Sequence, residues 1–180
     1  MQIRFTPDSS RDIGSGWERA WQAGRVDLAA LTATDLRYGF FEYPVDFTVD
    51  GHAFLAAADT PLVDLMFTVG HSLHGLRTEG AATIDFTENT YVIRLELVGD
   101  RVRFTASHDA PAPAPGCPLD AYACEARRFV TDGVEYLERQ HPALARNPAM
   151  AALRALAGVR ATPGCPATPG AAPRSGPYPR

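Results

Sequence analysis

Ser72 lies between two histidines in the segment 70–75, whose sequence is GHSLHG. A serine hydroxyl becomes a nucleophile when a nearby imidazole accepts its proton. His71 and His74 are three residues apart, and on a helix this spacing can bring two imidazoles to one metal ion. The segment therefore raises an enzyme hypothesis: a small hydrolase that uses Ser72, or a metal-dependent enzyme that uses His71 and His74.

The same six residues resemble the sequence GHSLGG at the nucleophile elbow of lipases in the α/β-hydrolase family. That elbow requires a glycine two residues after the nucleophile, where backbones pass closely in a strained turn. His74 occupies this position instead. Apolar residues also recur at helical spacing from Leu62 to Leu76, which favours a continuous helix over an elbow. We therefore expect Ser72 to be an ordinary helix residue, and we expect no catalytic residues.

A metal site needs more ligands than this histidine pair offers. On a helix the side chains of His71 and His74 diverge by about 60°, and no glutamate motif accompanies them. The three cysteines, Cys117, Cys124 and Cys165, also lack the spacing of metal ligands. We expect no metal site, no cofactor and three free thiols, and we consider binding a better hypothesis than catalysis.

The elements of the chain are clearest between residues 82 and 107. Apolar and polar residues alternate there in three runs that two turn-like pairs separate, as in an antiparallel meander. With residues 99–100 as one turn, Leu95 lies opposite Phe104 on the apolar face. Residues 88–89 form the other turn, and we expect one face of the meander to be buried and the other to contact solvent.

The solvent face of this meander carries charges of both signs. Its register pairs Glu96 with Arg103 and Arg94 with Thr105, and Arg101 follows the turn. Such a face suits either a solvated sheet or a surface on which another protein docks. We expect Arg94, Glu96, Arg101 and Arg103 to be the binding residues.

Hydrophobic periodicity predicts further elements outside the meander. Alternation at 36–40 and 45–49 predicts one bent strand or two short ones. Helical periodicity predicts helices at 61–76 and 119–141, and a last helix is expected from the cap Asn147 to residue 158. Together these elements predict an α+β fold with a largely antiparallel β-sheet, which includes the three-strand meander and has one face covered by two to three helices.

A chain of 180 residues can bury one sizeable core, so we expect one domain. Residues 1–109 form its N-terminal segment, a helix and the meander. Residues 110–118 are a proline- and alanine-rich linker loop, and residues 119–158 supply the C-terminal helices of the same domain. The composition of residues 159–180 predicts a disordered tail.

Charge and hydropathy limit the partners of the chain. All seventeen basic residues are arginines, and twenty-one acidic residues give a net charge of −4. An acidic body of this kind is poorly suited to nucleic acid. No run has the length and apolar character of a signal peptide or a membrane span. We expect a cytoplasmic protein, a monomer or weak homodimer, that contacts neither nucleic acid nor a membrane.

The segments VDFTVDG and TENTYVIRLELVGDRVRFTAS, together with the order of the elements, resemble small actinobacterial α+β domains of the immunity-protein type. The resemblance covers roughly residues 36 to 157 and is one of pattern, so it transfers no functional residue. It implies a non-enzymatic protein-binding domain that neutralises a toxin partner by covering it. The alternative class remains a hydrolase or metal-dependent enzyme at Ser72 or at His71 and His74.

Overall fold

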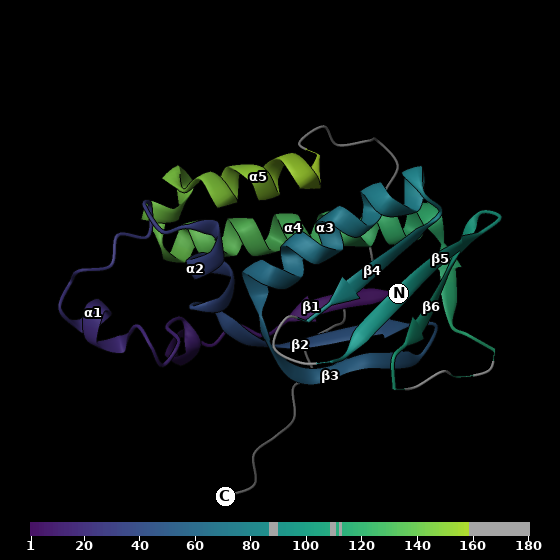
Figure 1. The fold of residues 1–180 in the computed structure, drawn as a ribbon, viewed down its shortest axis with the longest axis horizontal. Helices are drawn as coiled ribbons and strands as arrows, with labels where there is room; N and C mark the ends of the chain where they lie inside the picture. The colour runs from purple at the N-terminus through teal and green to yellow at the C-terminus, as the bar shows by residue number, and fades with distance from the viewer. Residues whose placement is uncertain (87–89, 109–110, 112, 159–180) are drawn as a thin grey trace, which may run out of the picture.

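The computed structural model describes residues 1–86, 90–108, 111 and 113–158 (Figure 1). The fold is α+β, as predicted, but its antiparallel strands form two sheets of three and four strands. The strands are β1 (Gln2–Phe5), β2 (Glu42–Val49), β3 (His52–Pro61), β4 (Ala81–Asp85), β5 (Val92–Val98), β6 (Arg101–Ala106) and β7 (Gly116–Pro118). The longer helices are α3 (Leu62–Thr78), α4 (Leu119–Gln140) and α5 (Pro148–Ala157).

The first sheet has the order β1-β2-β3, and a tight turn joins its last two strands. Asp50 and Gly51 both have positive φ angles, of 50° and 79°, which is the backbone of a type I′ hairpin turn. A bulge interrupts the pairing opposite Asp46, whose Oδ1 accepts a hydrogen bond from the N–H of Ala57 at 2.8 Å. No pattern in the sequence predicts β3, because the alanine-rich centre of this strand lacks the residues that favour strands.

The second sheet has the order β4-β5-β6-β7 and contains the predicted meander. Leu95 pairs with Phe104 and Ile84 pairs with Ile93, so the predicted register is confirmed. The turn expected at 88–89 lies outside the described residues. The expected linker loop at 110–118 is partly wrong, since Gly116 to Pro118 form β7 on the outer edge of β6.

The alternation at 36–40 does not form a strand, and that prediction is wrong. Residues Ala33–Tyr38 form the helix α2. Thr32 caps this helix: its Oγ1 accepts a hydrogen bond from the N–H of Asp35 at 3.1 Å and donates one to the Asp35 carboxylate at 2.7 Å. The capping hydrogen bonds stabilise a helix here more than the short alternating pattern favours a strand.

The predicted helices are confirmed. α3 and α4 cross closely at Gly133, where an added Cβ would lie 2.3 Å from the sulfur of Met66, so any larger residue would require the Met66 side chain to move. Asn147 caps α5 by accepting a hydrogen bond from the N–H of Ala149 at 2.8 Å, and Gly158 ends it in the left-handed conformation. A short helix, α1 (Glu18–Gln22), precedes α2.

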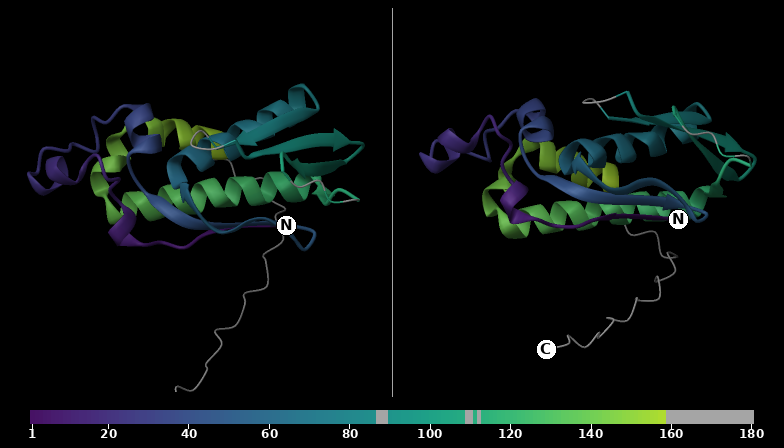
Figure 2. Two further views of the ribbon diagram at one scale, coloured as in Figure 1. Left: turned by 60° about the horizontal axis from the view of Figure 1, so that its bottom comes forward. Right: turned by 90° about the horizontal axis from the view of Figure 1, so that it is seen from below.

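Aromatic rings join the two sheets and α4 in one core. The Phe104 ring of β6 lies 6.1 Å from that of Phe47 on β2 and 5.6 Å from that of Tyr122 on α4, measured between ring centroids. Figure 2 shows α4 running along the first sheet, with the second sheet reaching over the same helix. The apolar face of the meander is therefore covered by the other sheet as well as by helices.

Side chains of α4 also close the free edge of β1. Glu125 Oε1 accepts a hydrogen bond from the N–H of Ile3 at 2.6 Å, and Arg128 donates to the Ile3 carbonyl at 2.8 Å. Burial would raise the pKa of Glu125, but the bonds from Arg128 and Ile3 outweigh it and lower that pKa. An edge strand whose backbone groups are satisfied in this way is protected from pairing with another chain.

Within the described ranges, no helix combines the length and apolar character that crossing a membrane requires.

Candidate functional site

The residues predicted to bind a partner lie on the exposed face of the second sheet. Backbone pairing places Arg94 between Thr83 and Thr105 in one rung, and places Glu96 opposite Arg103 in the next. All three charged side chains are exposed. Because neighbouring residues in a strand point to opposite faces, the buried pair of Leu95 and Phe104 requires this outward orientation.

This face is hollowed. A depression of about 680 Å³ extends from β4 across β5 to β6. Its lining includes three of the four predicted binding residues; the lining residues are Glu79, Ala81, Ala82, Thr83, Arg94, Leu95, Glu96, Arg103, Thr105 and Ala114. We call this depression the outer hollow.

The fourth predicted residue, Arg101, has another position. It does not belong to the lining of the outer hollow, and its guanidinium donates a hydrogen bond to the Gly116 carbonyl at 2.9 Å. That bond ties β6 to β7 at the rim of the sheet. Arg101 therefore stabilises the edge of the sheet, and only Arg94, Glu96 and Arg103 converge on the hollow.

The charged side chains of the hollow make no direct polar contact with the part of the chain that the structure describes. Among the residues that the structure describes, the side chains of Arg94, Glu96 and Arg103 form no hydrogen bond and no ion pair, although Glu96 stands directly opposite Arg103. Arg94 has only threonines in its own rung. The hollow therefore presents two cationic groups, two flanking hydroxyls and the carboxylates of Glu79 and Glu96 to an incoming molecule.

The residues of the enzyme hypothesis are not brought together. Ser72 is 3 % exposed, and its hydroxyl donates to the Val69 carbonyl at 2.7 Å and shares a hydrogen bond with the Tyr122 hydroxyl. Burial raises the pKa of Tyr122. His71 and His74 are both exposed, and within the described ranges no group of three metal-binding side chains is found. Ser72 thus has the contacts of a core residue that joins α3 to α4.

The cysteines differ from one another. Cys117 is a buried free thiol, and burial raises its pKa. Cys124 is disulfide-bonded, so the expectation of three free thiols is wrong at this position. Cys165 lies outside the described residues. The sequence pattern carried no sign of this bond, because spacing along the chain does not reveal which cysteines meet.

A buried polar cluster holds the N-terminal segment against the end of α4. The Asp12 carboxylate accepts a hydrogen bond from the Tyr43 hydroxyl and lies 2.9 Å from Nε2 of His141. Burial, followed by the hydrogen bond to Asp12, raises the pKa of Tyr43. The rings of Trp21 and Phe41 pack against the His141 ring. These contacts hold the N-terminal segment and β2 against the C-terminal end of α4, so the cluster is structural.

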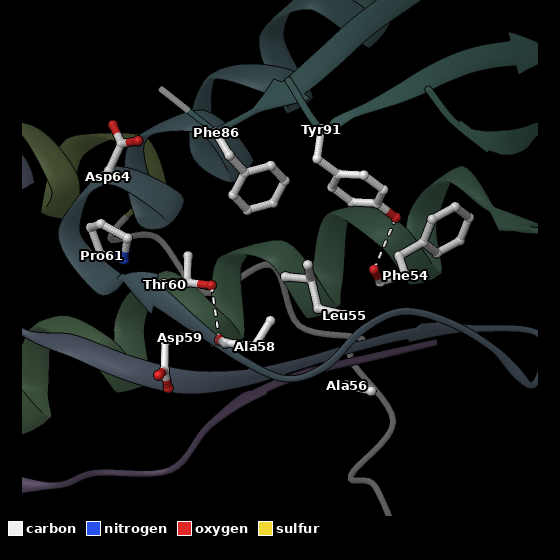
Figure 3. A pocket seen from close by; sticks show the side chains of 10 residues that line it. All are labelled: Phe54, Leu55, Ala56, Ala58, Asp59, Thr60, Pro61, Asp64, Phe86 and Tyr91. Carbon is white, nitrogen blue, oxygen red and sulfur yellow. Dashed lines mark hydrogen bonds between the residues drawn. The ribbon is translucent and has the colours of Figure 1, made fainter. Parts of the chain in front are cut away.

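A second concave site, which the sequence did not predict, lies beside β3. It is a cavity of about 310 Å³ between the end of β3, the first turn of α3, Phe86 after β4 and Tyr91 before β5 (Figure 3). We call it the β3 cavity. No local pattern predicts it, because its walls come from segments that are some thirty residues apart and include the unpredicted β3.

Comparisons with known protein families, with curated proteins and with solved structures find no match to this chain. Its function therefore has to be inferred from its own residues.

Proposed function

We propose that the protein is a non-enzymatic protein-binding domain and that its partner docks on the outer hollow. The observation that carries this proposal is the convergence of Arg94, Glu96 and Arg103 on one concave surface while none of their side chains has an ion pair or a hydrogen bond to another described residue. Charged groups that fold without partners of their own retain their full capacity to recognise complementary charges.

The charge pattern specifies the partner's surface. Arg94 lies between two threonines, so we propose that the partner places a carboxylate of its own against Arg94, within reach of the Thr83 and Thr105 hydroxyls. A basic group of the partner would face Glu96 and Glu79. Arginine is favoured at the centre of protein interfaces because its planar guanidinium binds a carboxylate through two hydrogen bonds.

The resemblance to immunity-type domains suggests the class of this partner, a toxin that the domain neutralises by covering it. Covering a toxin requires surface complementarity and no reaction centre, which agrees with the buried, hydrogen-bonded state of Ser72. The proposal does not depend on the toxin class, since the outer hollow would recognise any partner with the complementary charges.

Site-specific photo-cross-linking in the source cell tests the docking surface. A photoreactive residue at Thr105, inside the hollow, should give an adduct of one discrete mass, whereas the same residue at the exposed Ala152 of α5 should not. The double charge reversal R94E/R103E should abolish the adduct at Thr105. An adduct that forms equally at Ala152, or that persists in R94E/R103E, would contradict the proposal.

The matched control is the double charge reversal R19E/R25E. Both arginines are exposed near α1 and lie outside the lining of the outer hollow, and the change in net charge is the same. This variant should give the Thr105 adduct at the level of the unmodified protein. Loss of the adduct in both variants would mean that overall charge, and not the hollow, governs the association.

A further inference from the structure

The three cysteines of the chain differ in their chemical state, and the difference points to a cross-link. Cys117, on β7, is a buried free thiol. Burial raises the pKa of this thiol, so it stays protonated and is a poor nucleophile. Cys124, in the first half of α4, is disulfide-bonded. Cys165 is the only other cysteine in the chain, so it alone remains as an intramolecular partner for Cys124.

The end of α5 lies close to Cys124. A Cβ added to Gly158, the residue that ends α5, would be 3.9 Å from Nε of Arg127. Arg127 is three residues from Cys124 on α4, which is less than one helical turn. Six residues separate Gly158 from Cys165, and an extended chain of that length spans up to about 25 Å. The position at which the chain leaves α5 therefore allows Cys165 to reach Cys124.

A bond between these cysteines would close a covalent ring that contains most of α4 and all of α5. With ten residues, α5 is too short to be stable alone, and it depends on its packing against α3 and α4 (Figure 1). Asn147 holds the beginning of α5, because its side chain donates hydrogen bonds to the Leu28 and Leu31 carbonyls. The cross-link would attach the chain covalently just beyond the other end of this helix.

We propose that Cys124 and Cys165 form a disulfide that holds the C-terminal end of α5 against α4, and that reduction of this bond loosens α5. A dithiol opens the bond: the dithiol is oxidised to its own disulfide, while Cys124 and Cys165 each take up one electron and one proton. The Cys124 side of the bond is partly exposed, so a dithiol can reach it.

The state of this cross-link would follow the surroundings of the protein. Disulfides persist in oxidising surroundings and are reduced where glutathione and thioredoxin act. The end of α5 would therefore be fixed in the first case and released in the second. Cys124 does not belong to the lining of the outer hollow, and the cross-link does not depend on the function proposed for that surface.

Peptide mapping of the full chain tests the pairing. The protein is treated with oxidised glutathione, its free thiols are blocked with iodoacetamide, and it is cleaved before aspartate and after arginine. This cleavage places Cys124 in residues 120–127, apart from Cys117, and places Cys165 in residues 161–174. These two peptides should be linked, and dithiothreitol should separate them. A blocked Cys124, a bond from Cys124 to Cys117, or a disulfide-linked dimer would overturn the assignment.

Hydrogen exchange tests the effect on α5. Amides in the last turn, from Leu153 to Ala157, should exchange about tenfold faster after dithiothreitol reduces the protein, because the covalent restraint is lost. Amides of β5 should keep their rates. Cys165→Ser should exchange like the reduced protein and should not respond to dithiothreitol. Cys117→Ala is the matched control, and it should respond like the unmodified protein.

Equal exchange of α5 in the oxidised and reduced proteins would show that the cross-link does not hold this helix. An equal acceleration in α5 and β5 would also contradict the proposal, since the bond would then stabilise the whole domain and not the end of α5. A response to dithiothreitol that persists in Cys165→Ser would assign the effect to another thiol. The comparison with Cys165→Ser remains decisive if Cys117→Ala does not fold.

Discussion

Leu95 of β5 lies directly opposite Phe104 of β6 in the core, and neither side chain is more than 1 % exposed. The same pairing turns Arg94 and Glu96 toward solvent, because side chains alternate along a strand. One register thus determines both the core packing of the second sheet and the charge pattern of the outer hollow. A slip by one residue would bury the charges and expose the apolar face.

Leu95→Ala should therefore destabilise the protein by about 2 to 5 kcal/mol, the cost of truncating a large buried aliphatic side chain. Denaturant unfolding monitored by circular dichroism measures this free energy. Glu96→Ala is the matched control on the exposed face of the same strand, and it should change the stability by less than about 0.5 kcal/mol. Similar costs for the two substitutions would contradict the assigned faces.

Glu125→Gln tests the contact that closes the edge of β1. The pKa of Glu125 is lowered in the folded protein, so its ionised form contributes stability above its ordinary pKa of 4.5. That contribution is lost as the pH falls through the folded-state pKa. At pH 7 the variant should be less stable by about 1.5 to 3 kcal/mol, the range for hydrogen bonds to a charged group.

The free energies of unfolding of the two proteins should converge as the pH is lowered below about 4. Glu135→Gln on the exposed face of the same helix is the control, and it should show little difference at either pH. A deficit for Glu125→Gln that stays constant or grows toward low pH would show that the carboxylate does not stabilise the edge through its charge.

Ser72→Ala tests whether this serine is structural. The substitution leaves the fully buried Tyr122 hydroxyl without the shared hydrogen bond, which should cost about 1 to 3 kcal/mol. Adding Tyr122→Phe removes the hydroxyl that has lost its partner, so the double variant should lose less stability than the sum of the losses in the two single variants.

We also expect the protein not to hydrolyse short-chain esters. Ester hydrolysis that Ser72→Ala abolishes would instead favour the enzyme hypothesis.

The sequence predicted elements whose signals are local. The turn at 99–100 and the alternation around it determine the register of β5 and β6, and the cap at Asn147 determines the start of α5. The same alternation led to Arg94, Glu96 and Arg103 as candidate binding residues, which the structure places on one concave surface. Their role in binding stays a prediction.

Features that depend on distant contacts could not be predicted. Asn147 also donates hydrogen bonds to the Leu28 and Leu31 carbonyls, at 2.7 and 3.1 Å, more than a hundred residues away. Asp64 of α3 is buried against Arg37 from α2, a contact that no pattern within α3 itself indicates. The β3 cavity likewise forms only where β3, α3 and the second sheet pack together, and the periodicity of a single segment does not predict such packing.

The affinity of the cross-linked partner, once purified, for R94E/R103E relative to R19E/R25E tests the central claim most directly. Calorimetric titration should show R94E/R103E binding at least about thirtyfold more weakly than the unmodified protein, since a central arginine contributes about 2 kcal/mol or more. R19E/R25E should bind within about twofold of the unmodified protein. Equal affinities for the two variants would show that the outer hollow is an ordinary solvated sheet face and that the partner docks elsewhere.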